Sequence, residues 1–222
     1  MHLEVSRAME ILMEPVQYVC LGFMAIMYAI KIKTLLGKPF PPEKAELKGD
    51  RVSGAIYSLG NVLRPWEMES TRKNSYFYIE FVIFHIAVAL TIGSTFFIPL
   101  IPQIMTPFVT KLIMLFMALA FFIGCRRIYR RFAKPEIKII SSPDDYFAII
   151  LMTVFFAVGF MALAQLPEHP ESKWMWLYFL MTTFFLIYVP FSKISHYVLY
   201  PFGRVNFGMI FGGRGVINRN AH

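Results

Sequence analysis

Long apolar runs alternate with short, charge-rich segments along the whole chain. Five runs reach the roughly 20 mostly apolar residues that a helix needs to cross a bilayer. They lie at about 15–36, 77–99, 108–125, 146–166 and 174–198. None alternates as a β-barrel strand does, and apolar runs of this length need helices to satisfy their backbone groups. The pattern predicts an all-α integral membrane protein, a single membrane domain over residues 1–222 built as a five-span transmembrane helix bundle.

Composition agrees with this pattern. The 222 residues are 57% hydrophobic and only 16% charged, with 17% aromatic residues. Both of the first two values depart from soluble domains in the direction of membrane proteins, which excludes a disordered chain and an ordinary soluble enzyme. The two cysteines, Cys20 and Cys125, both fall in apolar stretches and cannot form a disulfide framework.

The basic residues predict the orientation of the bundle. Nineteen of the 22 Lys and Arg residues lie in the segment 31–76, in the connection 126–138, or from Lys193 onward. All three regions fall on one side of a five-span bundle, and positive charge marks the cytoplasmic side. We therefore expect the amino terminus outside and the carboxyl terminus in the cytoplasm of a multi-pass protein of the cell's inner membrane. The net charge of +8 is then explained by topology, and we expect no nucleic-acid partner.

The cytoplasmic connection 37–76 contains one further helical pattern. Apolar residues recur at helical spacing between Val52 and Trp66, and Pro65 ends the run. This spacing predicts a short amphipathic helix that either rests on lipid at the interface or offers a docking surface. The cytoplasmic tail, 199–222, is rich in glycine and is expected to be flexible and to contact a partner.

Two of the five histidines, His85 and His196, lie within predicted spans, where ionisable side chains are costly and often functional. At a rise of 1.5 Å per residue, His85 lies about 12 Å from the cytoplasmic end of its span and His196 about 6 Å. Both therefore belong to the cytoplasmic half of the bundle. Two imidazoles at similar depth on different helices can ligate one haem iron from its two sides. The alternative is that each histidine donates a hydrogen bond between helices.

Neighbouring residues fit a haem site. Phe81 and Phe84 could pack on the macrocycle, and Lys193, Arg126 and Arg127 are cations available for its propionates. Glu80 is either a proton-handling carboxylate or an interfacial charge, and the interfacial interpretation is the favoured one.

Two short motifs resemble the respiratory nitrate reductase gamma subunit, a family of membrane b-type cytochromes. They are Phe84-His85-Ile86 and the run from Pro190 through Phe191-Ser192-Lys193-Ile194-Ser195 to His196. The membrane cytochrome subunits of heterodisulfide-reductase-like complexes are similar too. The resemblance implies that His85 and His196 are axial ligands of haem b. It also implies electron transfer between a membrane quinone and a cytoplasmic iron–sulfur subunit, as part of a multi-subunit oxidoreductase that this chain alone does not complete.

The chain departs from that family at a second histidine pair, which would hold an outer haem. Thr95 and Tyr178 occupy those positions. We therefore expect a single haem, and a quinone pocket in the inner half of the bundle, because an electron could not otherwise cross most of a ~30 Å core. Glu80, Ser195 and Tyr197 are the candidate quinone contacts, along with Lys193. The iron–sulfur subunit is expected to dock on the cytoplasmic connections and tail.

Two other functions remain open from the sequence. A haem-free membrane anchor or assembly subunit would need neither histidine. A transporter would need discontinuous helices in matching halves, and the sequence has no internal repeat to suggest them.

Overall fold

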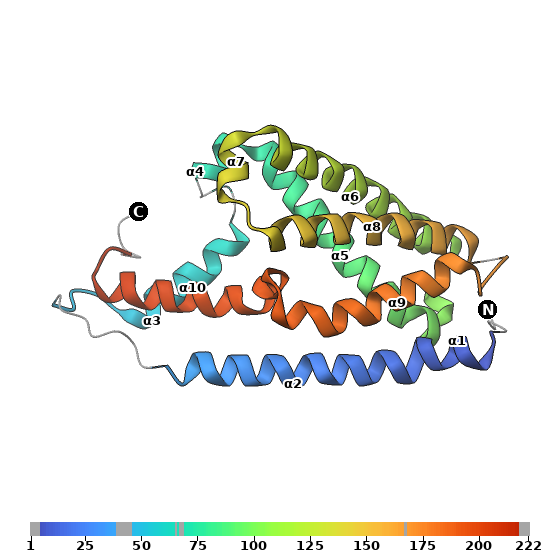
Figure 1. Ribbon diagram of the computed structural model, residues 1–222. Helices are drawn as coiled ribbons and strands as arrows, with labels where there is room; N and C mark the ends of the chain where they lie inside the picture. Colours follow the sequence, from blue (N-terminus) through green and yellow to red (C-terminus); the bar gives the residue numbers. More distant parts are fainter. Residues whose placement is uncertain (1–4, 39–45, 65, 67–68, 167, 218–222) are drawn as a thin grey trace. The chain divides into compact units, whose positions relative to one another are not determined.

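The computed structural model describes residues 5–38, 46–64, 66, 69–166 and 168–217, and every regular element in these ranges is helical (Figure 1). Five helices are long and apolar enough to cross a membrane: Arg7–Leu36, Ser75–Leu100, Pro107–Ala133, Pro143–Gln165 and Lys173–Phe191. The prediction of five spans is therefore confirmed. The chain is a multi-pass membrane protein, and its spanning helices imply contact with the lipid bilayer.

The chain forms two compact units. The first contains Met1–Met27 and Ile79–Ile194, and the second contains Tyr28–Tyr78 and Ser195–His222. The two candidate haem ligands are thus divided between them, with His85 in the first unit and His196 in the second. Each unit is described by itself below.

Four long helices build the first unit: α5 (Ser75–Leu100), α6 (Pro107–Ala133), α8 (Pro143–Gln165) and α9 (Lys173–Tyr188). α6 packs against α8, and α8 packs against α9 (Figure 1). Thr106, Ser142 and Ser172 cap the amino-terminal ends of α6, α8 and α9 with their side chains. The short α7 (Pro135–Ile140) lies between α6 and α8.

The chain's first helical stretch joins the unit through one buried polar side chain. α1 (Arg7–Ile11) continues through a π-helical turn, Leu12–Val16, into α2 (Gln17–Leu36). The fully buried Gln17 donates from Nε2 to the Phe179 carbonyl at 3.0 Å and to Thr183 Oγ1 at 2.7 Å. These two hydrogen bonds satisfy the buried NH₂ group of the amide and hold this helix against α9.

The fifth span differs from the sequence expectation at its end. The apolar pattern predicts one helix over 174–198, but α9 ends at Tyr188 and is followed by a 3₁₀ turn at Val189–Phe191. A second 3₁₀ turn covers Lys193–Ser195, and α10 (His196–Gly213) begins directly after it. Pro190 has no N–H to continue the helical ladder, which accounts for the break. His196 therefore lies at the start of a new helix rather than inside the fifth span.

The second unit is built around α3 (Arg51–Gly60) and α10, which pack against each other (Figure 1). The contact depends on small residues at i, i+4 spacing on both helices. A Cβ on Gly208 would meet the Gly54 carbonyl and Ser58 Cβ, and one on Gly212 would meet Gly54 Cα. Such small-residue spacing lets two helix backbones approach closely, as in membrane helix pairs.

Two expectations about this unit change. The tail expected to be flexible is a helix as far as Gly213, with residues 218–222 outside the described residues. The helix expected within Val52–Trp66 forms over Arg51–Gly60 with a 3₁₀ turn to Leu63, and Pro65 is also outside the described residues. Its protein-facing side is Gly54 and Ser58, while Val52 and Ile56 each remain 63% exposed on the opposite side.

Candidate functional site

His85 lies in the first unit on α5, ten residues after the helix begins, and is half-buried. Its Nδ1 lies 2.7 Å from the Phe81 carbonyl oxygen, one turn earlier. Because a carbonyl oxygen can only accept, Nδ1 carries the hydrogen and Nε2 is the nitrogen with a lone pair. The Phe81 ring lies 4.0 Å from the imidazole, centroid to centroid. A histidine held in this way has the tautomer and ring orientation that metal-ligating histidines have.

Two arginines of α6 contact side chains in the turn of α5 that precedes His85. Glu80 is only 5% exposed and forms an ion pair with Arg126, and the Arg127 guanidinium lies over the Phe84 ring at 4.6 Å from its centroid. Phe84 is itself buried against Phe156. Glu80, which the sequence leads us to expect at the interface, is thus one half of an ion pair and is itself buried in the protein. Its partner lies 46 residues away in sequence, which no local pattern indicates.

Lys193 and the start of α8 form a second charged group in the same unit. Lys193 Nζ lies 2.9 Å from Asp145 Oδ2 and 2.7 Å from Ser142 Oγ. Asp144 accepts a hydrogen bond from the Tyr188 hydroxyl at 2.6 Å. Sequence reasoning missed both aspartates because an acidic pair in the first turn of a helix is ordinary capping chemistry.

The remaining candidates belong to the second unit. Ser195 is buried at the amino-terminal end of α10, whereas His196 and Tyr197 are exposed. The Tyr197 ring contacts the Tyr28 ring edge-on at 5.8 Å. The structure thus brings His85 together with Phe81 and Phe84, Glu80 with Arg126, Arg127 with Phe84, and Lys193 with Asp145. It places Ser195, His196 and Tyr197 in the other unit.

Side chains are tightly packed around Thr95 and Tyr178. Tyr178 is fully buried, its hydroxyl donates to the Thr91 carbonyl, and its oxygen lies 2.8 Å from Ser94 Oγ. The Phe155 ring lies 5.3 Å from the Tyr178 ring. Thr95 is fully buried as well, and its hydroxyl donates to its own helix, to the Ile92 carbonyl at 2.6 Å. We call Thr91, Ser94, Phe155 and Tyr178 the Tyr178 cluster.

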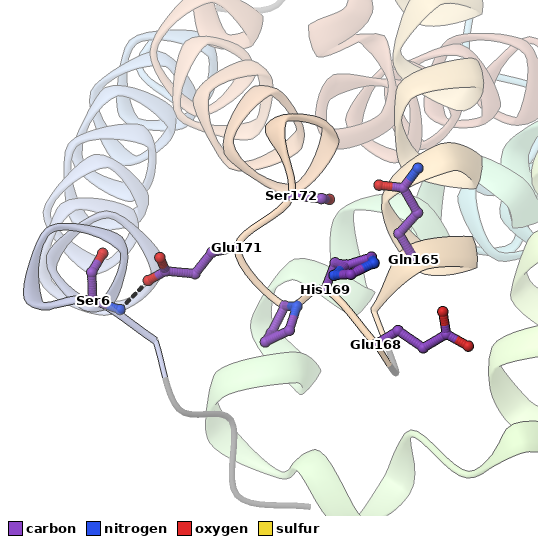
Figure 2. A pocket seen from close by; sticks show the side chains of 7 residues that line it. Ser6, Gln165, Glu168, His169, Glu171 and Ser172 are labelled. Carbon is purple, nitrogen blue, oxygen red and sulfur yellow. Dashed lines mark hydrogen bonds between the residues drawn. The ribbon is translucent and has the colours of Figure 1, made fainter.

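A shallow, open pocket lies at the far end of α8 from Asp145 (Figure 2). Its lining is polar, with Ser6, Gln165, Glu168, His169, Pro170, Glu171 and Ser172. Glu171 accepts a hydrogen bond from the Ser6 backbone N–H, drawn as the dashed line in Figure 2. Hydrogen bonding from Ser6 lowers the pKa of the exposed Glu171 carboxyl. The histidine here, His169, is exposed, as the sequence led us to expect for a turn.

Comparison with known proteins adds one relative. No protein-family model and no solved structure matches the chain. A protein of Nitratidesulfovibrio vulgaris strain Hildenborough is 27% identical over 170 residues, which cover 71% of each chain. Its name, simply "Protein", states no activity.

Proposed function

We propose that this chain is a haem b-carrying membrane subunit that transfers electrons between the membrane quinone pool and a cytoplasmic iron–sulfur subunit. His85 and His196 are the proposed axial ligands. The observation that carries the proposal is the hydrogen bond from His85 Nδ1 to the Phe81 carbonyl within a membrane span. It holds the ring and directs the lone pair of Nε2 away from its own backbone, as iron ligation requires.

The donor set fits a haem. Neutral imidazole is a suitable ligand for iron, and a bound haem would supply one-electron redox chemistry. Phe81 offers an aromatic surface beside the His85 ring, and its 47% exposure leaves room for contact with a macrocycle.

The ion pairs refine which cations would meet the propionates. Arg126 already binds Glu80, and Lys193 already binds Asp145. Arg127, which lies over Phe84 next to the His85 side chain, is the cation that we expect to contribute most. Arg126 and Lys193 would have to share their charge with an existing carboxylate partner.

A single haem is supported by the packing of the Tyr178 cluster. Each of its polar side chains already has a hydrogen-bond partner, and a second macrocycle would have to displace Tyr178 and Phe155. Because well-packed interiors hold few voids, this region offers no ready space for another cofactor. The quinone is accordingly proposed to bind in the inner half of the bundle. Of the candidate quinone contacts, Tyr197 and Lys193 are exposed, whereas Glu80 and Ser195 are buried.

The proposal includes the orientation of the chain in the membrane and a role for α3 at the lipid interface. With 19 of 22 basic residues on one side, the carboxyl terminus is cytoplasmic, in the inner membrane. α3 packs its Gly54 and Ser58 side on α10 and presents Val52, Ile56 and Leu59 outward. An outward apolar stripe flanked by Arg51 fits a helix resting at the lipid interface.

Redox difference spectroscopy of the purified chain tests the proposal. We expect a b-type signal, lost in His85→Ala and in His196→Ala because the iron loses one of its two axial bonds. His169→Ala is the matched control, since its side chain is exposed in a turn, and it should keep the full signal. Full haem content in either of the first two variants would overturn the ligand assignment. Absence of haem from the unaltered chain would favour the haem-free anchor.

A further inference from the structure

Two adjacent carboxylates at the start of α8, those of Asp144 and Asp145, bind residues on either side of the break between α9 and α10. Asp144 accepts hydrogen bonds from both sides of the break: from the Tyr188 hydroxyl at 2.6 Å and from the Lys193 backbone N–H at 3.3 Å. Asp145 binds the Lys193 ammonium at 2.9 Å. Charge-assisted hydrogen bonds are stronger than neutral ones, so the two aspartates hold the segment at its beginning and its end.

Helix capping alone does not account for this pair. Asp145 receives the Ser142 N–H at 2.8 Å in a capping box, and the helix amino terminus favours its charge. Asp144 takes no part in that box, and it accepts hydrogen bonds from two residues that flank the break. A capping box would be complete without Asp144 and without Lys193.

The held segment is short and internally ordered. Ser192 Oγ donates to the Val189 carbonyl at 3.1 Å and accepts the Ile194 N–H at 3.2 Å. The 3₁₀ turn Lys193–Ser195 then runs directly into α10, whose first residue is His196. Two residues, Ile194 and Ser195, lie between Lys193 and His196, so a contact that restrains the Lys193 backbone acts directly before α10.

We propose that Asp144, Asp145 and Lys193 form a clamp that positions His196 for axial ligation of the haem iron. This inference rests on the proposed function. The three are positioning residues, because they act on the backbone that leads to the ligand and do not touch the iron. The clamp also gives Lys193 a role in the Pro190–His196 motif other than propionate binding, because its ammonium faces Asp145.

Hydrogen–deuterium exchange on the full chain in detergent tests the clamp without depending on haem. Asp144→Asn combined with Asp145→Asn keeps the side-chain shapes but removes both charges. We expect exchange at the amides of residues 192–197 to rise by about tenfold, since the segment loses its charged hydrogen bonds. Glu168→Gln, an acid beyond the other end of the same helix, should leave that exchange unchanged. Equal protection of residues 192–197 in the double variant and the unaltered chain would overturn the clamp.

A spectroscopic measurement tests its effect on the ligand. In haem-loaded protein, Lys193→Gln should shift the largest g-value of the oxidised haem and its midpoint potential, because these report the orientation of the axial imidazoles. Lys193→Arg keeps the ion pair and should restore both values. Unchanged values in Lys193→Gln would refute positioning even where exchange rises. Absence of haem from the unaltered chain would instead refute the proposed function, and with it the role of the clamp.

Discussion

The Tyr178 cluster and the surroundings of His85 both belong to spanning helices of the first unit. They differ in the kind of polar side chain that each contains. In the Tyr178 cluster the polar groups are neutral, fully buried hydroxyls hydrogen-bonded to one another and to backbone carbonyls. Around His85 they are charged: Glu80 pairs with Arg126, and Arg127 lies over Phe84. The imidazole there is half-buried and the adjoining Phe81 is exposed.

This difference separates a structural region from a functional one. Satisfied neutral hydrogen bonds in a dry interior make a single packing arrangement stable, and they leave no group with which to bind a ligand. Buried charges within a span are expensive, so a site that retains them is a functional candidate. A haem at His85 and none at Tyr178 is the arrangement that this contrast supports.

Truncation of Tyr178 gives the largest expected loss of stability. Tyr178→Ala removes a buried ring between Phe155 and Ser94 and should lower the free energy of unfolding by about 4 kcal/mol. Thermal unfolding in detergent measures this loss. Haem content per folded chain should stay unchanged, and a loss of haem that exceeds the loss of folded protein would break the division between the two regions.

Removing Arg126 should have the next largest effect. Arg126→Leu leaves the Glu80 carboxylate buried without its arginine and should cost about 3 kcal/mol in the same unfolding assay. Combining it with Glu80→Leu removes the unpaired charge, so the double variant should recover most of that stability. If the double variant were no more stable than Arg126→Leu alone, the pair would not be the source of the loss.

A methyl group at Gly159 tests how tightly the Tyr178 cluster is packed. A Cβ there would lie 2.9 Å from Tyr178 Cε2 and 3.0 Å from Met117 Cε, so Gly159→Ala should destabilise the protein by about 1–2 kcal/mol. Gly22→Ala is the matched control, because a Cβ there meets nothing within 4 Å. Equal stability of the two variants would show a looser cluster than the contacts indicate.

These contrasts were only partly accessible from sequence. Five spans follow from apolar length, which is a local property. The end of the fifth span cannot be predicted in this way, because the apolar run continues through Val198. The break depends instead on Pro190 and on contacts from Asp144. The i, i+4 spacing of Gly208 and Gly212 is a sequence signal for a packed helix in the tail, although glycine content alone suggests flexibility. No sequence signal indicates that Glu80 is buried, because its burial depends on an arginine that is distant in the sequence.

Acid should weaken the contact between Ser6 and Glu171 in the pocket beyond α8. Because its pKa is lowered in the folded state, the Glu171 carboxylate contributes to stability above the ordinary pKa of 4.5. That contribution is lost as the pH falls through the lowered value. We expect faster exchange of the Ser6 amide at such pH, with Glu171→Gln showing little further change. If acid accelerated exchange of the Ser6 amide equally in Glu171→Gln, a group other than Glu171 would be responsible.

Electron paramagnetic resonance of the oxidised, unaltered chain tests the central claim most directly, namely that one haem is bound by two histidines near the basic end and none at Tyr178. The account predicts one low-spin, bis-imidazole signal that integrates to one spin per chain. Two such signals would mean that the Tyr178 region accommodates a second haem, and a high-spin signal would mean that His85 or His196 does not bind the iron. Either result would contradict the account.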